Sequence, residues 1–479
     1  IMDVAADFSL ETTAGTLSFS DHWTGDDSYL FIVRYGDVPY NGDVWNSDVG
    51  LLLQLAEDNV HIVFMSFDAG AAETVAEMEG RVNAALETLP AEQAAHWADR
   101  VHYVPSRVFD PATGWGIGAG GLQDFLQAHG YFWFAIDRFQ RWREIGSLHD
   151  WQSNTSPIGF IGHETSAFNY EAAIEERMGK LGATPVVLFD KGEHQGGWSA
   201  GYGTSTTVTL PDAEAMTGFD SMALHLYTAC PTHQQGKDKG CNEWDFIQNM
   251  VICDRPVPSE EATNDEACTP GDTLPCSCVL PGGEVSDSEH TCNEEGTGFG
   301  DCACSCSTEF ARWVTPYGRE ARWLTDLNPL LTLIRDGGER RFIFRGANGY
   351  TVDLELLLYN SGTGERAIGH TYLWGNPGGT SFNETYNDGK HPDVTFEAPP
   401  GTTRVELMAV ISGHGHSSTT ENCAEFCNHQ HEFNINGQLL VRDHPVAGTP
   451  YGCRDQMSEG VVANQFGTWP YGRGGWCAG

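Results

Sequence analysis

The sequence predicts a multidomain, mainly β protein, in which an N-terminal α/β domain precedes two β-sandwiches and the first sandwich carries a cysteine-rich insertion. The length of 479 residues favours more than one hydrophobic core. Strand-like and helix-like segments alternate up to about Asp150, whereas short strand-like segments dominate after Thr184. All 14 cysteines lie at or after Cys230. We therefore expect an α/β layer followed by β structure that depends in part on disulfides.

The alternation over the first 150 residues indicates a central sheet covered by helices. The strand-like runs are SYLFIVRY, VHIVFMSF, VHYVPS and YFWFAID, and the helix-like runs are DVGLLLQLAEDN, AETVAEMEGRVNAALETL and GLQDFLQAHG. Their order, beginning with FSLETTAGTLSFSDHWTGDDSYLFIV, resembles a thioredoxin-like or peroxiredoxin-like domain. No cysteine follows the strand at 28–35, and thiol–disulfide exchange requires a thiolate. We expect residues 1–165 to be a redox-inactive thioredoxin-like domain, and residues 166–183 to be a linker helix.

A glycine-rich run, GWGIGAGG, places Gly116, Gly118 and Gly121 in a G-x-G-x-x-G pattern ahead of a helix-like segment. Nucleotide-binding loops of this kind follow a strand, whereas here the preceding FDPATGW is turn-like. A loop that caps a helix is the better interpretation.

After Thr184, short apolar runs are separated by Gly, Pro, Asn and Asp, which is typical of β-sandwiches rather than βαβ units. The runs are PVVLFDK, STTVTLP, SMALHLY, FIQNMVIC, EFARWVTPY, RRFIFRG, TVDLELLLY, VTFEAPP, TRVELMAVISG and HEFNINGQ. The length of this region indicates two sandwiches, over residues 184–360 and 361–479.

Residues 254–306 interrupt the strand pattern. They are acidic, rich in Gly, Pro and Ser, and poor in large aliphatic residues, and eight cysteines fall between Cys253 and Cys306. Such a stretch cannot bury a core of its own and needs cross-links. Zinc is the alternative to disulfides, but the cysteine spacing is irregular, and we expect disulfides in a protein made in an oxidising compartment.

The composition excludes several classes of function. Acidic residues outnumber basic ones by 66 to 26, giving a formal charge of −40, which repels nucleic acid and anionic lipid. No apolar run is long enough to cross a bilayer, and no signal peptide is visible at the N-terminus. We expect an exported, mature protein that acts as a monomer in the extracellular space or periplasm, with neither nucleic acid nor membrane as partner.

Three charged residues lie in cysteine-framed loops. Asp245 follows Cys241 in CNEWDFIQNM, Glu425 lies between Cys423 and Cys427, and Arg473 precedes a further cysteine in GRGGWC. A single acid in so acidic a chain is most often a solvated surface group. Nevertheless, one carboxylate to activate water, a second acid, and an arginine for developing negative charge suffice for hydrolysis.

Three segments resemble the bacterial peptide-N-glycosidase F family. They are, in order, CNEWDF, ISGHGH…NCAEFCNHQHEFNIN and NQFGTWPYGRGGWC, and weaker likeness extends the resemblance over about 184–479. It implies a glycoamidase, which hydrolyses the amide between asparagine and the first N-acetylglucosamine of N-glycoproteins or N-glycopeptides. It also implies two adjacent jelly-roll domains, no metal or organic cofactor, and the disulfides Cys230–Cys241, Cys423–Cys427 and Cys453–Cys477.

The same resemblance assigns roles to individual residues. Asp245 matches the principal catalytic acid, Glu425 a second carboxylate and Arg473 a stabiliser of the intermediate. The residues that match positions around the chitobiose core are Trp244, His416 and Trp476.

The chain departs from the family pattern at several positions. Phe246 replaces an arginine, Phe426 replaces a tryptophan, and His414 replaces the tryptophan of a Gly-Trp-Gly-His motif. Arg345 or Gly346 falls where the family has a third glutamate. These changes bear on substrate preference.

Two other functions compete with the glycoamidase. His414, His416, His429 and His431 form two His-x-His pairs, and such a pair on a strand places both rings on one face, as copper or zinc sites require. Copper monooxygenases share a two-sandwich architecture, which makes a copper-dependent or zinc-dependent oxidoreductase the first alternative. The second is a glycan-binding protein without catalysis, since the third carboxylate is missing.

Overall fold

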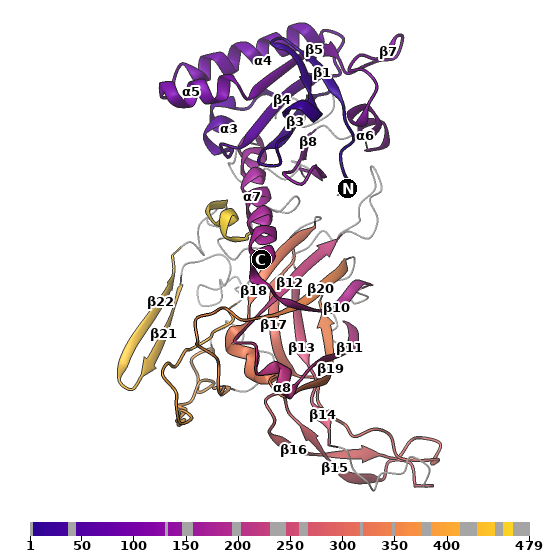
Figure 1. The fold of residues 1–479 in the computed structure, drawn as a ribbon, viewed down its shortest axis with the longest axis vertical. Coiled ribbons are helices and arrows are strands. Elements are labelled where there is room, and N and C mark those ends of the chain that lie inside the picture. The colour runs from indigo at the N-terminus through magenta and orange to yellow at the C-terminus, as the bar shows by residue number, and fades with distance from the viewer. Residues whose placement is uncertain are drawn as a thin grey trace.

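The computed structural model describes most of the chain. The described residues are 3–36, 45–129, 133–145, 157–193, 203–229, 246–257, 267–316, 320–346, 350–374, 385–411, 429–445 and 454–462. Figure 1 shows an α/β domain above a β-sandwich, with a cysteine-rich arm at the far end of the sandwich. The mainly β fold class with an N-terminal α/β domain is confirmed.

A five-stranded sheet forms the centre of the α/β domain, in the order β5-β4-β3-β8-β9. The strands β3, β4 and β5 are parallel, and β8 and β9 are antiparallel to them. Their bounds are β3 Ser28–Arg34, β4 Val60–Ser66, β5 Val101–Arg107, β8 Trp133–Ile136 and β9 Trp142–Glu144. The helices are α1 Phe19–His22, α3 Val49–Leu55, α4 Ala71–Leu86, α5 Ala91–Ala98 and α6 Gly121–His129, and two small hairpins are β1 Ser9–Thr12 with β2 Gly15–Ser18 and β6 Phe109–Asp110 with β7 Gly114–Trp115.

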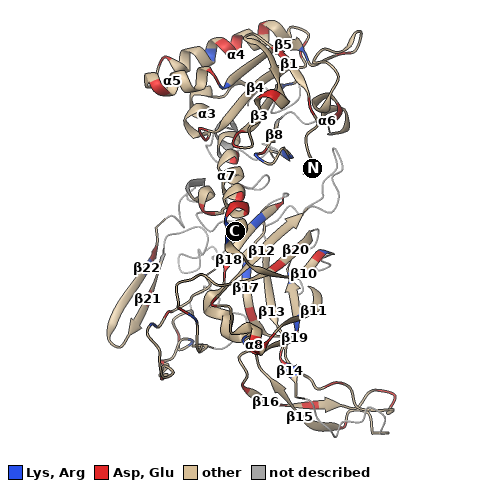
Figure 2. Cartoon of the chain, viewed as in Figure 1, with Lys and Arg blue, Asp and Glu red and all other residues tan. Residues whose placement is uncertain are grey.

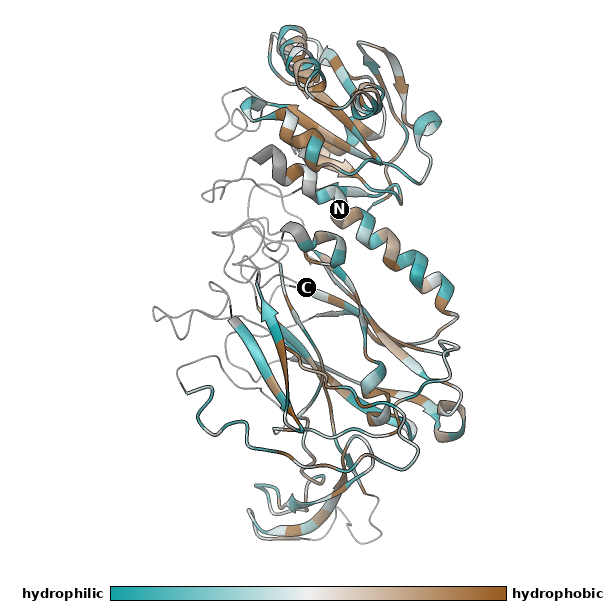
Figure 3. Ribbon diagram, turned by 90° about the vertical axis from the view of Figure 1, so that its left-hand side faces the viewer, coloured by the Kyte–Doolittle hydropathy of each residue, from teal (hydrophilic) through white to brown (hydrophobic). Residues whose placement is uncertain are grey.

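Strand β3 divides the hydrophobic core of this domain into two halves. Leu30 and Ile32 pack toward helices α3 and α4, whereas Phe31 and Val33 pack with α6 on the opposite face. Successive strand residues point to opposite faces, so a fully apolar strand requires cover on both. Figure 3 shows the resulting concentration of hydrophobic residues in the central strands. The α/β layer agrees with the prediction, and the closer likeness to thioredoxin stays a prediction.

The glycine-rich run serves backbone packing in this domain. A Cβ atom at Gly116 would lie 2.1 Å from the Arg107 carbonyl oxygen, and one at Gly121 would lie 2.1 Å from that of Ala6. The Gly120 carbonyl accepts a hydrogen bond from the Asp124 N–H in the first turn of α6. The glycines are therefore explained by close approach of three chain segments, in line with the helix-capping interpretation.

Helix α7 (Pro157–Leu181) joins the α/β domain to the sandwich. It is longer than the predicted linker helix 166–183 and crosses the predicted boundary at residue 165. The reason is that its first half carries apolar residues, such as Ile161 and Phe168, that pack into the α/β core. Within the described residues no helix is long and apolar enough to cross a membrane.

Eight strands form a sandwich of two four-stranded sheets, β10-β20-β12-β18 and β11-β19-β13-β17. The first strand pairs with the last, the second with the seventh, the third with the sixth and the fourth with the fifth. The chain is thus one long hairpin rolled into two sheets, which is the jelly-roll arrangement. The bounds are β10 Thr184–Glu193, β11 Gly203–Asp212, β12 Ser221–Ala229, β13 Ile247–Ile252, β17 Thr308–Val314, β18 Ala321–Asp326, β19 Gly337–Arg345 and β20 Thr351–Tyr359, with α8 Ala213–Met216 and η1 Asn328–Leu333 at one end.

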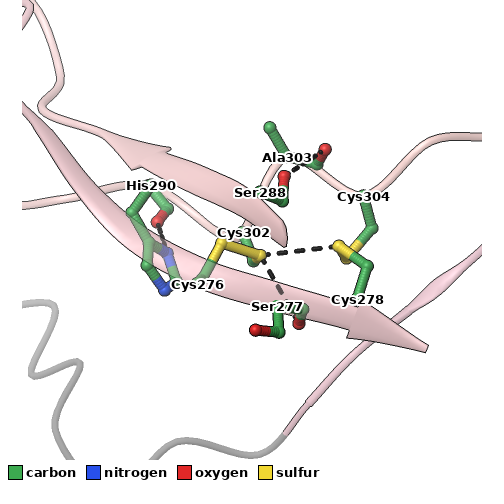
Figure 4. The surroundings of a disulfide bond; sticks show 9 residues. Cys276, Ser277, Cys278, Ser288, His290, Cys302, Ala303 and Cys304 are labelled. Atoms are coloured by element: carbon green, nitrogen blue, oxygen red, sulfur yellow. Dashed lines mark hydrogen bonds between the residues drawn. A yellow bond between two sulfur atoms is a disulfide. The ribbon is translucent and has the colours of Figure 1, made fainter. Parts of the chain in front are cut away.

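The cysteine-rich insertion leaves the sandwich after β13 and returns at β17, two strands that pair directly. It holds β14 (Arg255–Pro256), β15 (Thr273–Val279) and β16 (Val285–Thr291) in one small sheet. All eight of its cysteines are paired, as Cys253–Cys306, Cys268–Cys292, Cys276–Cys302 and Cys278–Cys304. The last two disulfides are neighbours, with the Cys278 and Cys302 sulfurs 3.6 Å apart (Figure 4). The prediction of disulfides in this region is confirmed.

The region after Tyr359 shows less strand structure than the sequence predicts. Within its described residues the strands are β21 (His429–Ile435) and β22 (Gln438–His444), which form one hairpin. The predicted strands VTFEAPP and TRVELMAVISG have no strand pairing over 394–411, and large apolar side chains such as Phe396 and Val405 are exposed. A strand needs a partner, and the neighbouring segments 375–384 and 412–428 lie outside the described residues. The second sandwich, with the boundary at residue 361, stays a prediction.

The short helix η4 (Arg454–Glu459) ties the two domains together. Met457 belongs to the α/β core, whereas Val462 belongs to the sandwich core. Between them, the Gly460 carbonyl accepts a hydrogen bond of 2.9 Å from the Trp323 indole N–H of β18. A Cβ atom at Gly460 would lie 2.7 Å from the Tyr170 ring of α7, so this turn needs glycine.

Replacing Cys276 and Cys302 together by serine should loosen the insertion without unfolding the sandwich. The loop that this disulfide closes spans 26 residues, for which chain entropy predicts a loss of roughly 3 kcal/mol. Limited proteolysis with mass spectrometry should show cleavage within 254–306 at least tenfold faster than in the unaltered protein, with cleavage of the α/β domain unchanged. Equal protease resistance would show that the small sheet is stable without this cross-link.

The stability of the α/β domain should fall as the pH is lowered from about 6.5 toward 4. The His61 and His102 rings lie with nitrogens 3.0 Å apart, beside Arg100, Asp27 and His22. Burial, and then neighbouring positive charge, lowers the pKa of each ring to about 4, so the unfolded chain binds more protons below pH 6.5. Between pH 6.5 and pH 4, each ring then lowers the free energy of unfolding by about 1.4 kcal/mol per pH unit.

Urea unfolding of the unaltered protein and of His102→Gln at pH 7 and pH 4.5 checks this expectation. The loss of stability between pH 7 and pH 4.5 should be smaller in the variant, because the variant lacks one of the two histidine rings whose pKa is lowered in the folded protein. An equal loss in both proteins would assign the acid sensitivity to other groups.

Candidate active site

The predicted site residues all lie outside the described residues. They are Asp245, Glu425, Arg473, Trp244, His416 and Trp476, together with the six cysteines of the three predicted disulfides and His414. These assignments, and the three disulfides, stay predictions. The structure does describe the segments that border them, and these define which end of the sandwich carries Asp245.

One end of the sandwich carries the loop that contains Asp245. Strand β12 ends at Ala229 before this loop, and β13 begins at Ile247 after it. In the register, Ala229 pairs with Thr351 and Thr228 pairs with Ala321, so the connections 315–320 and 346–350 emerge at the same end. Figure 1 shows this end facing the α/β domain. The cysteine-rich insertion begins at Cys253, at the end of β13 opposite to Phe246.

The residue that follows Asp245 is fixed on both of its backbone polar groups. The Phe246 N–H donates to the Thr315 hydroxyl oxygen at 2.8 Å, and the Thr315 N–H donates to the Phe246 carbonyl at 2.9 Å. Thr315 is fully buried at the end of β17. The next residue, Pro316, accepts a 2.7 Å hydrogen bond from the buried Tyr350 hydroxyl. A side chain that must hold its geometry benefits from such rigid support.

A buried amide lies beside this anchor. Gln248 is fully buried on β13, and its side-chain nitrogen and oxygen have no hydrogen-bond partner among the described residues. Gly346 packs against it, since a Cβ atom at Gly346 would lie 2.7 Å from the Gln248 Cγ. A buried polar group without a hydrogen-bond partner lowers the free energy of unfolding by about 1–3 kcal/mol. Packing of the side chain alone gives no reason for this cost. The neighbouring Arg345 donates a hydrogen bond of 2.7 Å to the Cys306 carbonyl.

A cluster of buried charges joins the α/β domain to this end of the sandwich. The Arg143 guanidinium of β9 binds both oxygens of Glu171 on α7, at 2.6 and 2.8 Å, and reaches Asp137 at 3.1 Å. Its Nε lies 3.8 Å from Glu320, the residue before β18. A second pair crosses the junction, in which Arg322 of β18 donates to Glu175 of α7. Acidic and basic residues occur together at this junction in Figure 2.

The cluster is electrostatically stable as an ionised group. Burial by itself raises the pKa of Glu171, but Arg143, with Arg322 and Arg141, lowers that pKa to about 2. Burial likewise opposes the charge of Arg143, while Glu171, Asp137 and Glu320 hold its pKa above the usual value. Sequence patterns do not predict this cluster, because none of its members is close in sequence to a motif.

The hairpin β21–β22 lies directly after the Glu425 segment and adds a residue that the sequence analysis also missed. His444 of β22 pairs in register with His429, and its Nε2 lies 3.0 Å from the Nδ1 of His431. Tyr386 lies against His431, with ring centroids 6.0 Å apart. The predicted His-x-His pair thus gains a third histidine from the neighbouring strand. The sequence signal for His444 is its position on the strand that follows HEFNINGQ, because a hairpin pairs this strand with the His-x-His strand.

Together, these features define a multidomain β protein whose jelly-roll sandwich presents loops toward an α/β domain. Comparison with known families gives the closer assignment: residues 381–479 match the family described as "Peptide-N-glycosidase F, C terminal". The predicted resemblance to this family is confirmed over this segment. It contains the positions of Glu425 and Arg473.

Two further comparisons add no argument about activity. No curated protein matches the chain. A solved structure described as a peptide-N(4)-(N-acetyl-beta-D-glucosaminyl) asparagine amidase is similar at 14% identity and a TM-score of 0.31, covering 62% of this chain and 80% of that chain.

Replacing Thr315 by valine should destabilise the start of β13. Valine keeps the shape but removes the oxygen that accepts the Phe246 N–H, and an unpaired buried donor costs about 1–3 kcal/mol. Urea unfolding should show this loss, and hydrogen exchange should be faster in peptides that begin several residues before Phe246 and include it. The matched control is Thr207→Val on an exposed position of β11, where we expect a change within about 0.5 kcal/mol. Equal effects of the two changes would contradict the assigned role of Thr315.

Proposed function

We propose that the protein is a glycoamidase that hydrolyses the amide bond between asparagine and N-acetylglucosamine in N-glycoproteins or N-glycopeptides. The observation that carries the proposal is the family match over residues 381–479, which encloses Glu425 and Arg473. The fixed backbone of Phe246 supports it, because this residue directly follows Asp245.

In this proposal Asp245 accepts a proton from the attacking water or acts on the amide, and water adds to the amide carbonyl carbon. Arg473 stabilises the negative charge that develops on the carbonyl oxygen. The carbon–nitrogen bond then breaks, the nitrogen leaves with the sugar as a glycosylamine, and the asparagine becomes aspartate. Glu425 is the second carboxylate, and Trp244, His416 and Trp476 contact the chitobiose core, where aromatic faces pack on sugar rings.

The proposal extends to the setting of the enzyme. The disulfides of the insertion support export to an oxidising compartment. We place the protein in the extracellular space or periplasm of a bacterium, acting as a monomer on glycosylated protein or peptide.

A metal-dependent function is the second candidate, and one observation favours it. The contact between His431 and His444 places two imidazole nitrogens 3.0 Å apart on the hairpin that also holds His429. Imidazole nitrogens are ligands for copper and zinc. In that case activity would depend on the metal and would be lost with a chelator.

The decisive experiment treats a purified N-glycopeptide with the protein, with and without chelator, and follows the products by mass spectrometry. We expect glycan release with conversion of Asn to Asp, no effect of the chelator, and a loss of at least 100-fold in rate in Asp245→Asn, because removing a general acid or base costs about 10²–10⁴. Glu432→Gln on the exposed hairpin is the control and should keep full activity. Release that requires metal would favour the His431–His444 site, and binding without release would favour a glycan-binding protein.

A further inference from the structure

Two disulfides of the cysteine-rich insertion lie in contact with each other. Cys276 and Cys278 are separated by one residue on β15, and so are their partners Cys302 and Cys304 on the segment beside it. The Cys302 sulfur lies 3.6 Å from the Cys278 sulfur of the other disulfide. Figure 4 shows the Cys276 sulfur on the side of Cys302 that faces away from Cys278. In this arrangement a Cys278 thiolate can attack Cys302, with Cys276 as the leaving group.

Hydrogen bonds as well as disulfides hold these sulfurs near one another. Strands β15 and β16 pair along their whole length. The segment that carries the other two cysteines is bound to β16, because the Ser288 hydroxyl donates to the Ala303 carbonyl at 2.9 Å and the Ala303 N–H donates to the Glu289 carbonyl at 3.0 Å. The sulfurs therefore stay neighbours while one bond between them is exchanged for another.

His290 of β16 lies beside the Cys276–Cys302 disulfide. One of its ring nitrogens is within 4.8 Å of both sulfurs. Its Nδ1 lies 2.8 Å from the Gly300 carbonyl oxygen, which can only accept a hydrogen bond, so Nδ1 carries a hydrogen and Nε2 can take up a proton. An imidazolium formed in this way stabilises a thiolate next to it, and a stabilised thiolate is a better leaving group.

We propose that Cys276, Cys278, Cys302 and Cys304 form a thiol–disulfide exchange site that oxidises an external dithiol. The entering thiolate attacks the Cys304 sulfur, because Cys304 is partly exposed whereas Cys278 is 1% exposed. The bond between these two sulfurs breaks, and Cys278 leaves as a thiolate. A buried thiolate lacks the solvation of water, and the nearby Cys302 sulfur offers it a bond.

The second step transfers the disulfide inward. Cys278 forms a bond with Cys302, the Cys276–Cys302 bond breaks, and Cys276 leaves beside His290. The second thiol of the dithiol then displaces Cys304 from the mixed disulfide. The dithiol has lost two electrons and two protons and has become a disulfide, while the protein keeps the new Cys278–Cys302 bond and carries two thiols, on Cys276 and Cys304. This activity is independent of the proposed glycoamidase function.

Brief treatment of the full chain with dithiothreitol tests the inference. The reaction is quenched with acid at partial reduction, free thiols are alkylated with N-ethylmaleimide at low pH, and the cysteine positions are read by tandem mass spectrometry. We expect alkylated Cys276 and Cys304 together with a Cys278–Cys302 cross-link. Any other pair of thiols among the four overturns the transfer, and resistance of both disulfides to dithiothreitol overturns the exchange site.

A double variant tests the point of entry. Cys278→Ala with Cys304→Ala removes the disulfide that the dithiol attacks and leaves Cys276–Cys302 in place. Opening of Cys276–Cys302 should then be roughly tenfold slower than in the unaltered protein, because the dithiol no longer reaches it through Cys304. The matched control, Cys268→Ala with Cys292→Ala, removes another disulfide of the insertion and should leave the transfer unchanged. Equal rates in the two double variants overturn entry through Cys304.

His290→Gln tests the role of the ring, since the glutamine amide keeps a donor for the Gly300 carbonyl. The Cys276 thiol should appear roughly tenfold more slowly, because its thiolate loses a neighbouring positive charge. His22→Gln is the control, since the His22 Nδ1 likewise lies 2.9 Å from a backbone carbonyl oxygen, that of Ser18, but in the α/β domain. An unchanged rate in His290→Gln overturns the assigned role of His290.

Discussion

The guanidinium of Arg143 is the group on which the placement of the two domains depends. It is almost completely buried, and a charge in that position is tolerated only with its full set of carboxylates. Glu171 and Asp137 come from its own side of the junction, whereas Glu320 comes from the sandwich. The two domains therefore share one electrostatic centre. They also share the segment around η4, which contributes Met457 to one hydrophobic core and Val462 to the other.

The nested pairing of the sandwich determines which features can act together. Because the fourth and fifth strands form the innermost pair, whatever lies between them projects from the end opposite to the 230–245 loop. The base of the cysteine-rich insertion and Phe246 consequently lie at opposite ends of β13. The α/β domain, by contrast, contacts the sandwich near the start of β18, through Glu320 and Arg322.

Local patterns in the sequence were sufficient to predict much of this fold. The apolar run SYLFIVRY predicts a strand covered on both faces, and β3 is buried as expected. Seven of the eight sandwich strands follow from short apolar runs between turn residues, whereas β18 (Ala321–Asp326) was not predicted. The paired cysteines follow from their number and density. The interruption by the insertion was predictable because FIQNMVIC and EFARWVTPY both read as strands.

Features that depend on contacts distant in sequence could not be predicted in the same way. Arg143 looks like a surface residue in the sequence, and its partner Glu171 is 28 residues away. His444 becomes relevant only through the register of β21 and β22. The start of α7 was not predicted. Apolar residues near Ile161 pack into the α/β core, and they lie on the same helix that leads to the sandwich, so this helix crosses the predicted domain boundary at residue 165. The resemblance that identified Asp245, Glu425 and Arg473 came from composite motifs, and their geometry lies outside the described residues.

The place of the cysteine-rich insertion has a consequence for how this chain can vary. Its ends are held next to each other, since Ile252 pairs directly with Thr308 and the Cys253–Cys306 disulfide closes the base. A segment that enters and leaves a sheet at adjacent points can be lengthened, shortened or exchanged without moving the strands that carry it. The tip of the rolled hairpin is therefore a natural attachment point, where relatives or engineered versions can carry a different accessory module while the opposite end stays the same.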